Sequence, residues 1–234
     1  MSTLIKIAVR NLTRYRRRSF LTASLIAIGV IAVVVFEAAS GAFTGLMIGQ
    51  MTDAMLGHLQ VHRRGYVASI DNLPLTLMLT PADVAVVEQT LRAQPGVESY
   101  SRRLKFGAMF SNYTETTALR LNGVHPEDEW RTLPLLASRI TRGTATLEKG
   151  HIIIPDLLAN GMGVKLGDTV VVIATNRDGS VNAAQLVVSG VLANVTGPSG
   201  RDGYLHIEDA MSLLRMDAPE ISEIAVRLKD FDQL

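Results

Sequence analysis

The chain has 234 residues, with 23 Lys and Arg against 22 Asp and Glu, so its formal net charge is +1. It holds no cysteine, which excludes disulfides, thiol catalysis and thiolate metal sites. Residues 1–50 hold six basic residues and one acidic residue, a net of +5, so the rest of the chain carries −4. A mildly acidic body lacks the clustered basic face that nucleic acid requires, so we expect no nucleic-acid partner.

Residues 1–18 form a cytoplasmic, basic segment with an amphipathic pattern. Its apolar residues recur at helical spacing and leave the basic side chains largely on another face. These apolar residues are Leu4, Ile5, Ala8, Val9 and Leu12. Such a helix lies at the headgroup surface or contacts a cytoplasmic partner, and we take Leu4, Ile5, Ala8 and Leu12 as the candidate coupling residues. A basic flank held only by phospholipid explains the pattern equally well.

Residues 19–52 are predicted to be a transmembrane helix that continues as a stalk. Glu37 is the one charged residue between Ser19 and Asp53, and the uncharged run 19–36 spans the ~30 Å apolar core of a bilayer at about 1.5 Å per residue. Flanking basic residues favour a cytoplasmic N-terminus. The alternative is a cleaved secretory signal ending in the small residues 38–42, although both the basic region and the apolar run are long for one.

The far half of this helix carries a glycine at every fourth residue. Gly41, Gly45 and Gly49 lie on one helical face, which is the small-xxx-small pattern of packed membrane helices. The alternative is that Gly41 ends the helix, because each interior glycine costs about 1 kcal/mol relative to Ala. Glu37, near the outer boundary, either lines a polar pathway or meets interfacial water.

Residues 53–234 predict a periplasmic α+β domain of short strands and a few helices. Thr80 is a predicted N-cap for a helix that starts at Pro81. Residues 125–129 are expected to form an acidic loop that places Trp130 at a surface. Two hairpins are expected to join neighbouring strands. The predicted strands are 56–62, 97–110, 114–124, 150–154, 169–174, 184–191, 204–207 and 223–228, and two further helices are 155–161 and 208–215.

Motifs for catalysis or cofactor binding are missing from the sequence. No P-loop, HExxH or GxSxG pattern occurs, and Gly161-x-Gly163-x-x-x-Gly167 lacks the dinucleotide-binding spacing. His58 and His62 lie four apart and make at most half a metal site, whereas a polar strand face is the plainer explanation. We therefore expect a protein that is not an enzyme and has no cofactor or metal of its own.

Several short motifs, taken in order, resemble one family of membrane proteins. The N-terminal Ala8-Val9-Arg10-Asn11-Leu12 and Arg16-Arg17-Arg18, the segment 57–66 after the stalk, and the later segments 154–159, 164–170, 188–191 and 204–207 carry the likeness. Together they resemble permeases of the MacB/FtsX superfamily, particularly the lipoprotein-releasing, Lol-type members. The likeness covers most of the chain.

This resemblance implies a non-hydrolysing permease subunit of an inner-membrane ABC transporter, with ATP bound by a partner. Implied partners are a cytoplasmic ABC ATPase, a second permease copy or paralogue, membrane lipid, and a lipoprotein substrate or periplasmic adaptor. Such permeases carry three further spans after the periplasmic domain, whereas this sequence stops at Leu234 and resembles the first half of one. The alternative function is a single-span anchored binding or adaptor module with no transport role.

Overall fold

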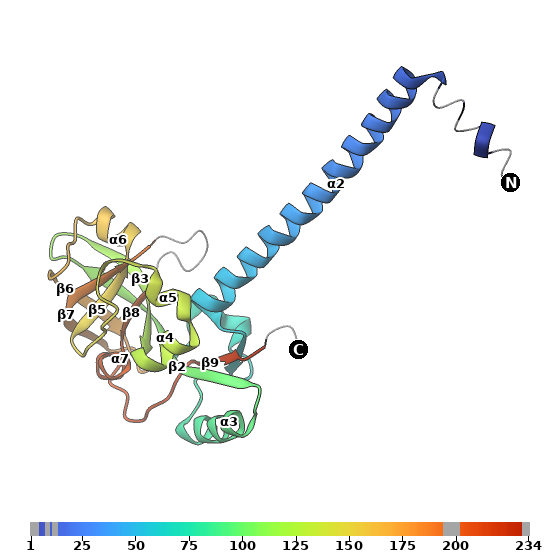
Figure 1. The fold of residues 1–234 in the computed structure, drawn as a ribbon. Helices are drawn as coiled ribbons and strands as arrows, with labels where there is room; N and C mark the ends of the chain where they lie inside the picture. Colours follow the sequence, from blue (N-terminus) through green and yellow to red (C-terminus); the bar gives the residue numbers. More distant parts are fainter. Residues whose placement is uncertain (1–4, 8–9, 11–13, 194–201, 231–234) are drawn as a thin grey trace. The chain divides into compact units, whose positions relative to one another are not determined.

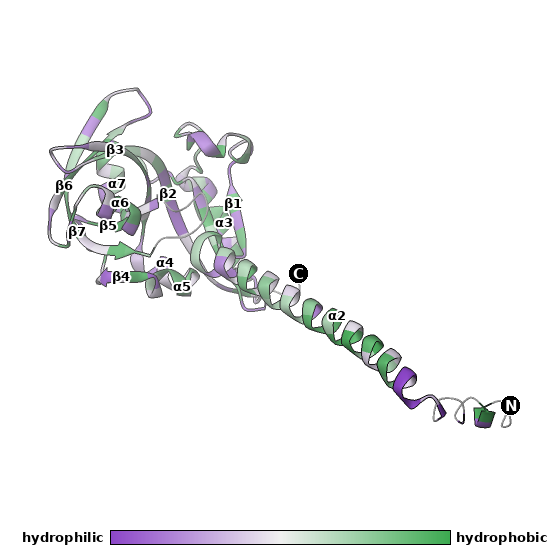
Figure 2. Cartoon of the chain, turned by 90° about the horizontal axis from the view of Figure 1, so that it is seen from above, coloured by the Kyte–Doolittle hydropathy of each residue, from purple (hydrophilic) through white to green (hydrophobic). Residues whose placement is uncertain are grey.

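The computed structural model describes residues 5–7, 10, 14–193 and 202–230, and it divides the chain into two compact units, Met1–Gly49 and Gln50–Leu234. Helix α2 (Arg16–Met51) makes up most of the first unit. It is long and apolar enough to cross a membrane, and Figure 2 shows it green along most of its length after a purple start. The helix starts at Arg16, before the predicted start at Ser19, because Arg is a good helix former and is tolerated in a first helical turn.

The second unit contains nine strands and a set of short helices among the described residues. The strands are β1 (Leu59–His62), β2 (Val97–Ser111), β3 (Thr116–Val124), β4 (Ile140–Gly143), β5 (His151–Pro155), β6 (Thr169–Thr175), β7 (Val181–Leu192), β8 (Asp202–His206) and β9 (Glu223–Leu228). The helices are the π-helical η1 (Thr52–Leu56), the 3-10 helix η2 (Val67–Asn72), α3 (Pro81–Ala93), α4 (Pro126–Thr132), α5 (Pro134–Ser138), α6 (Asp156–Gly161) and α7 (Ile207–Leu213).

Six of these strands close into a barrel. Strand β2 pairs with β3, β3 with β8, β8 with β5, β5 with β7, β7 with β6, and β6 returns to β2. The β3–β8 and β5–β7 pairs are parallel and the other four are antiparallel. Closure removes the free edges that an open sheet of these strands would expose. Figure 1 shows the strands wrapped around one another, with α7 close to the barrel.

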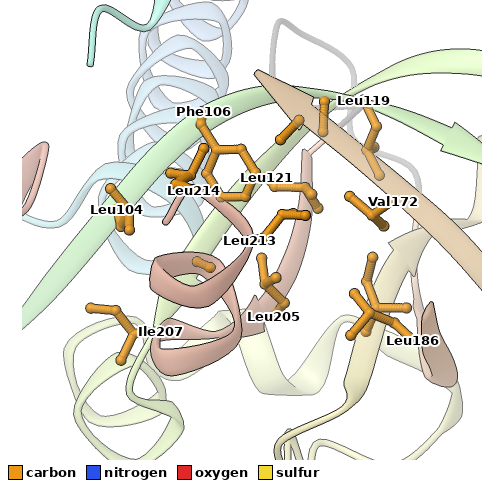
Figure 3. Close-up of a cluster of buried hydrophobic side chains, with 14 of the residues drawn as sticks. Leu104, Phe106, Leu119, Leu121, Val172, Leu186, Leu205, Ile207, Leu213 and Leu214 are labelled. Atoms are coloured by element: carbon orange, nitrogen blue, oxygen red, sulfur yellow. The ribbon is translucent and has the colours of Figure 1, made fainter. Parts of the chain in front are cut away.

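The barrel interior is the main hydrophobic core. Inward side chains from β2, β3, β6, β7 and β8 meet there, and the end of α7 adds Leu213 and its C-cap Leu214 (Figure 3). Strand β5 is apolar on both faces: Ile152 and Ile154 belong to this core, whereas Ile153 belongs to a second cluster with Leu133 and Leu136 around α4 and α5. A strand covered on both sides shows a continuous apolar run instead of alternation.

Strand β2 is long enough to belong to two sheets. Its residues 97–103 pair with β9, which also pairs with β1, whereas its residues 103–111 pair with β3 in the barrel. The side chains that face the interior change from odd to even positions where the strand passes from one sheet to the other, from Ser101 and Arg103 to Leu104 and Phe106. Arg103 therefore sits at the division between the two.

Most predicted elements of the domain are confirmed, and the others are corrected as follows. Thr80 caps α3 in a capping box with Asp83, and both hairpins, β2–β3 and β6–β7, are present. The strand predicted at 56–62 starts at Leu59, because Leu56 completes the π-helical turn and Gly57 has a left-handed φ of 77°. The predicted acidic loop 125–129 is mostly helix α4, whose Pro at its first position favours helix. Trp130 is half-buried, because its indole donates to the carbonyl of Ala145 and its ring packs near Tyr204.

Candidate functional site

The structure describes only part of the predicted site residues. Leu4, Ala8 and Leu12 lie outside the described residues, whereas Ile5 is in a short helical piece and is exposed. All three stripe glycines lie in α2. A Cβ added at Gly41 or Gly45 meets nothing within 4 Å, so neither glycine is required by the packing of this chain. The coupling role of the N-terminal residues and the helix-packing role of the glycines stay predictions.

Several polar contacts surround the residues that follow α2. We call residues 52–58 the junction segment. Its π-helical turn is closed by the amide of Gly57, which donates to the carbonyl of Thr52 at 3.0 Å. A Cβ on Gly57 would lie 3.0 Å from the carbonyl oxygen of Val226 in β9, so the segment packs directly against that strand. The next amide, of His58, donates to the same carbonyl at 2.8 Å.

Three consecutive residues of the junction segment are each held by a different arginine. Arg227 in β9 pairs with the Asp53 carboxylate at 2.6 Å, and Arg139 at the end of α5 donates to the carbonyl of Ala54 at 3.4 Å. Arg103 in β2 donates to the carbonyl of Met55 at 2.9 Å. Carbonyls at a helix C-terminus lack helical partners and carry partial negative charge, so cationic donors are the groups that suit them.

Arg103 is also the centre of a buried charge cluster. Its Nε donates to both oxygens of the Glu129 carboxylate, at 2.9 and 3.1 Å, and its Nη2 lies 2.8 Å from the nearer one. Its Nη1 donates to Glu223 at 3.0 Å. Lys105 approaches Glu223 at 3.3 Å. Arg103 is 2% exposed and both glutamates are fully buried, so this cluster joins β2, α4 and β9 through charge-assisted bonds in a dry environment.

Electrostatics favour the charged forms of Glu223 and Arg103. Burial would raise the pKa of Glu223, but the charges of Lys105 and Arg103 outweigh it and hold that pKa below its usual value. Burial likewise opposes the charge on Arg103, and Glu129 and then Glu223 reverse that effect, so the pKa of Arg103 is raised. Burial and the nearby Glu223 raise the pKa of Tyr66 to about 12, which keeps its phenol neutral.

The two histidines singled out in the sequence have structural partners instead of a shared ligand. His58 lies 3.6 Å from Asp53 and its Nδ1 accepts from the amide of Leu228. His62 stacks on Tyr66 with ring centroids 5.0 Å apart and lies 3.9 Å from Glu223. Among the described residues, no group of three His, Asp or Glu side chains is arranged to hold a metal ion.

Sequence reasoning missed Arg103, Glu129, Glu223 and the three-arginine arrangement. In β2 the inward positions before the barrel are Ser99, Ser101 and Arg103, all polar, so alternation alone marks that face as solvent-exposed. Glu129 sits within an acidic run, where it looks like any surface carboxylate. The available signal was the length of the predicted 97–110 strand, which is too long to pair with one neighbour throughout.

A long apolar helix followed in the chain by an α+β barrel domain defines a membrane-anchored protein with an extracytoplasmic type of domain. A family model described as the MacB-like periplasmic core domain matches residues 19–234, and the chain belongs to that family. The family places it among the permease subunits of ABC transporters, in which this domain is a noncatalytic part. No curated protein matches the chain.

Two solved structures are similar to the chain. The periplasmic region of MacB from Actinobacillus actinomycetemcomitans is 14% identical, with a TM-score of 0.50 and 73% of each chain covered. The extracellular domain of the ABC-type transporter YknZ from Gram-positive bacteria is 17% identical, with a TM-score of 0.48, and covers 74% of this chain and 84% of that one. At this identity the MacB likeness speaks for the fold alone.

Proposed function

We propose that this permease subunit couples ATP hydrolysis by a cytoplasmic ABC ATPase to the movement or release of a periplasmic substrate, either a lipoprotein or another apolar molecule. The observation that carries the proposal is that one family match runs without a break from residue 19 through the apolar helix and the whole domain. A membrane helix that leads directly into such a domain connects the cytoplasm, where the ATPase hydrolyses ATP, to the periplasm, where the substrate is moved.

The charge pattern supports the orientation that this function requires. Lys6, Arg10, Arg14 and the run 16–18 all precede the apolar stretch, and basic flanks stay on the cytoplasmic side. The domain then lies across the inner membrane from the ATPase. The N-terminal segment with Leu4, Ile5, Ala8 and Leu12 is the part of the chain available to contact that partner.

A second copy or a paralogue completes the proposed transporter. Gly41, Gly45 and Gly49 give α2 a face on which another helix approaches closely, as small residues do in membrane helix pairs. A Cβ added at Gly41 or at Gly45 would meet no other atom of this chain within 4 Å, so both positions are open to a neighbouring helix.

Breaking the N-terminal helix tests the coupling. In membranes that contain the assembled transporter, Ala8→Pro removes a backbone donor and clashes with the preceding turn, at about 3 kcal/mol. Insertion should persist because the basic run at 16–18 is unchanged, but ATP hydrolysis should no longer produce substrate release, measured as transfer of radiolabelled lipoprotein out of the vesicles. Ala8→Ser is the matched control. Wild-type release by the proline variant would mean that this segment serves topology only.

A further inference from the structure

The three contacts on the junction segment come from three separate elements of the domain. Arg227 belongs to β9, Arg139 to the turn between α5 and β4, and Arg103 to β2. Each holds one of the consecutive residues Asp53, Ala54 and Met55. A single arginine would attach the segment to one strand. Three arginines attach it at once to β9, to the turn between α5 and β4, and to β2.

Every one of these arginines is itself fixed by a second contact. Arg103 is bound to Glu129 and Glu223, Arg227 also pairs with Glu98 at 3.1 Å, and Arg139 also donates to the carbonyl of Ala193 at 3.2 Å. A planar guanidinium that is already oriented loses less conformational freedom for each further hydrogen bond. The arginines are therefore held in place independently of the segment that they bind.

A glycine such as Gly57 often marks a flexible joint, but in this structure Gly57 is held rigidly against β9. Its left-handed φ of 77° and its position 3.0 Å from the Val226 carbonyl, measured from an ideal Cβ, fit it tightly against β9. Ala54 is 1% exposed and Gly57 is buried as well, while their neighbours in the segment are half-buried, so the segment packs against the domain as well as bonding to it. Residues 53–57 are thus an integral part of the domain and not a linker in front of it.

We propose that Arg103, Arg139 and Arg227 form an arginine anchor: they are positioning residues that pass a force arriving along the chain at Gln50 to β2, α5 and β9 together. This role rests on the proposed function, in which ATP hydrolysis on one side of a membrane does work on the other. Shared over three elements, the force displaces the domain as one body instead of peeling off a single edge strand, since β1 has only β9 as a partner among the described strands.

Single-molecule pulling on the full chain in detergent micelles tests the anchor without any partner protein. Because the chain has no cysteine, handles are placed uniquely at Gln50→Cys and at Val181→Cys, an exposed position in β7. In the double variant R139A/R227A the first extension should occur at clearly lower force than in the parent chain. It should measure about 15 Å, the difference between residues 50–57 extended at ~3.3 Å and helical at ~1.5 Å per residue.

The controls separate force transmission from ordinary stability. The double variant R92A/R142A removes two arginines that also pair with carboxylates but lie away from the junction segment, and it should leave the first extension unchanged. Heat denaturation followed by the fluorescence of Trp130 should have the same midpoint in both double variants. An unchanged first-extension force in R139A/R227A, or an equal loss in R92A/R142A, would overturn the proposal.

If R139A/R227A does not fold, the single variants R139K and R227K decide the question. Lysine keeps the charge but cannot bind the segment and its second partner with one planar group. Each single variant should lower the force of the first extension, and parental force in both would contradict the anchor. The transporter function itself fails on a different result, the absence of an ATPase partner, so the two are distinguishable.

Discussion

Arg103 is the residue on which the largest stability effect should fall. Arg103→Met keeps the volume but leaves Glu129 and Glu223 buried without their shared partner, and breaking a buried ion pair in this way costs about 3–5 kcal/mol. Urea unfolding, followed by the fluorescence of the single tryptophan, Trp130, measures the change. Arg142→Met is the control, because the exposed Arg142–Asp156 pair contributes roughly 0–1 kcal/mol. Similar losses in the two variants would contradict a special role for Arg103.

Glu223 should make the domain less stable as the pH becomes acidic. Its folded-state pKa is depressed, because Lys105 and Arg103 outweigh the effect of burial, so its contribution is present above the unfolded value of about 4.3 and is lost as pH falls through the folded value. The free energy of unfolding should therefore fall less steeply below about pH 5 in Glu223→Gln than in the parent chain. Urea titrations at a series of pH values measure this free energy. If it fell equally steeply with pH in Glu223→Gln and in the parent chain, the predicted contribution of Glu223 would be contradicted.

At the residue scale the sequence predicted caps and turns better than charges. Thr80 and Asp83 were readable because capping depends on neighbours in the chain. Arg103 and Glu223 were not, because they are 120 residues apart and only the β2–β9 pairing brings them together. The candidate coupling residues Leu4, Ala8 and Leu12 lie outside the described residues, so their role stays a prediction.

Among the elements, α2 offers a direct test of the glycine stripe. A single cysteine at Ile48, on the stripe side of the helix, should form a disulfide-linked dimer in oxidised membranes, either between two copies or with a paralogue given a cysteine at the matching position. Gly45→Leu should lower its yield at least severalfold by separating the helices. Gly29 is the matched control, because about 100° per residue places it on the opposite side of α2 from Gly45 and a Cβ there also meets open space. Equal yields in Gly45→Leu and Gly29→Leu would leave the stripe without a pairing role.

Element types were predictable where local patterns are strong, and pairing partners were not. Hairpins followed from the short connections at 111–116 and 175–181, and the α3 start followed from Thr80-Pro81. The parallel β3–β8 and β5–β7 pairs, which close the barrel, leave no local mark because their partners are far apart in sequence. Strand β4 was missed because its four residues, Ile140–Gly143, are largely exposed and polar.

For the whole molecule, the charge asymmetry predicts a definite topology. A cysteine at Ser2 should resist a membrane-impermeant maleimide added to intact cells with a permeabilised outer envelope, whereas one at Ser180, in the β6–β7 turn, should react within minutes. Detergent should make both reactive, which serves as the control. Labelling at Ser2 with protection at Ser180 would reverse the orientation.

The central claim is that this chain works as the permease subunit of an ATP-driven transporter. The most direct measurement is to isolate the tagged chain from native membranes in mild detergent and to assay ATP hydrolysis in the purified material. We expect a co-isolated ABC ATPase in a fixed ratio to the chain, and we expect its rate of hydrolysis to change when Ala8→Pro replaces the parent sequence. A chain that is isolated in its membrane form with no nucleotide-hydrolysing partner would contradict the account and favour an anchored binding module.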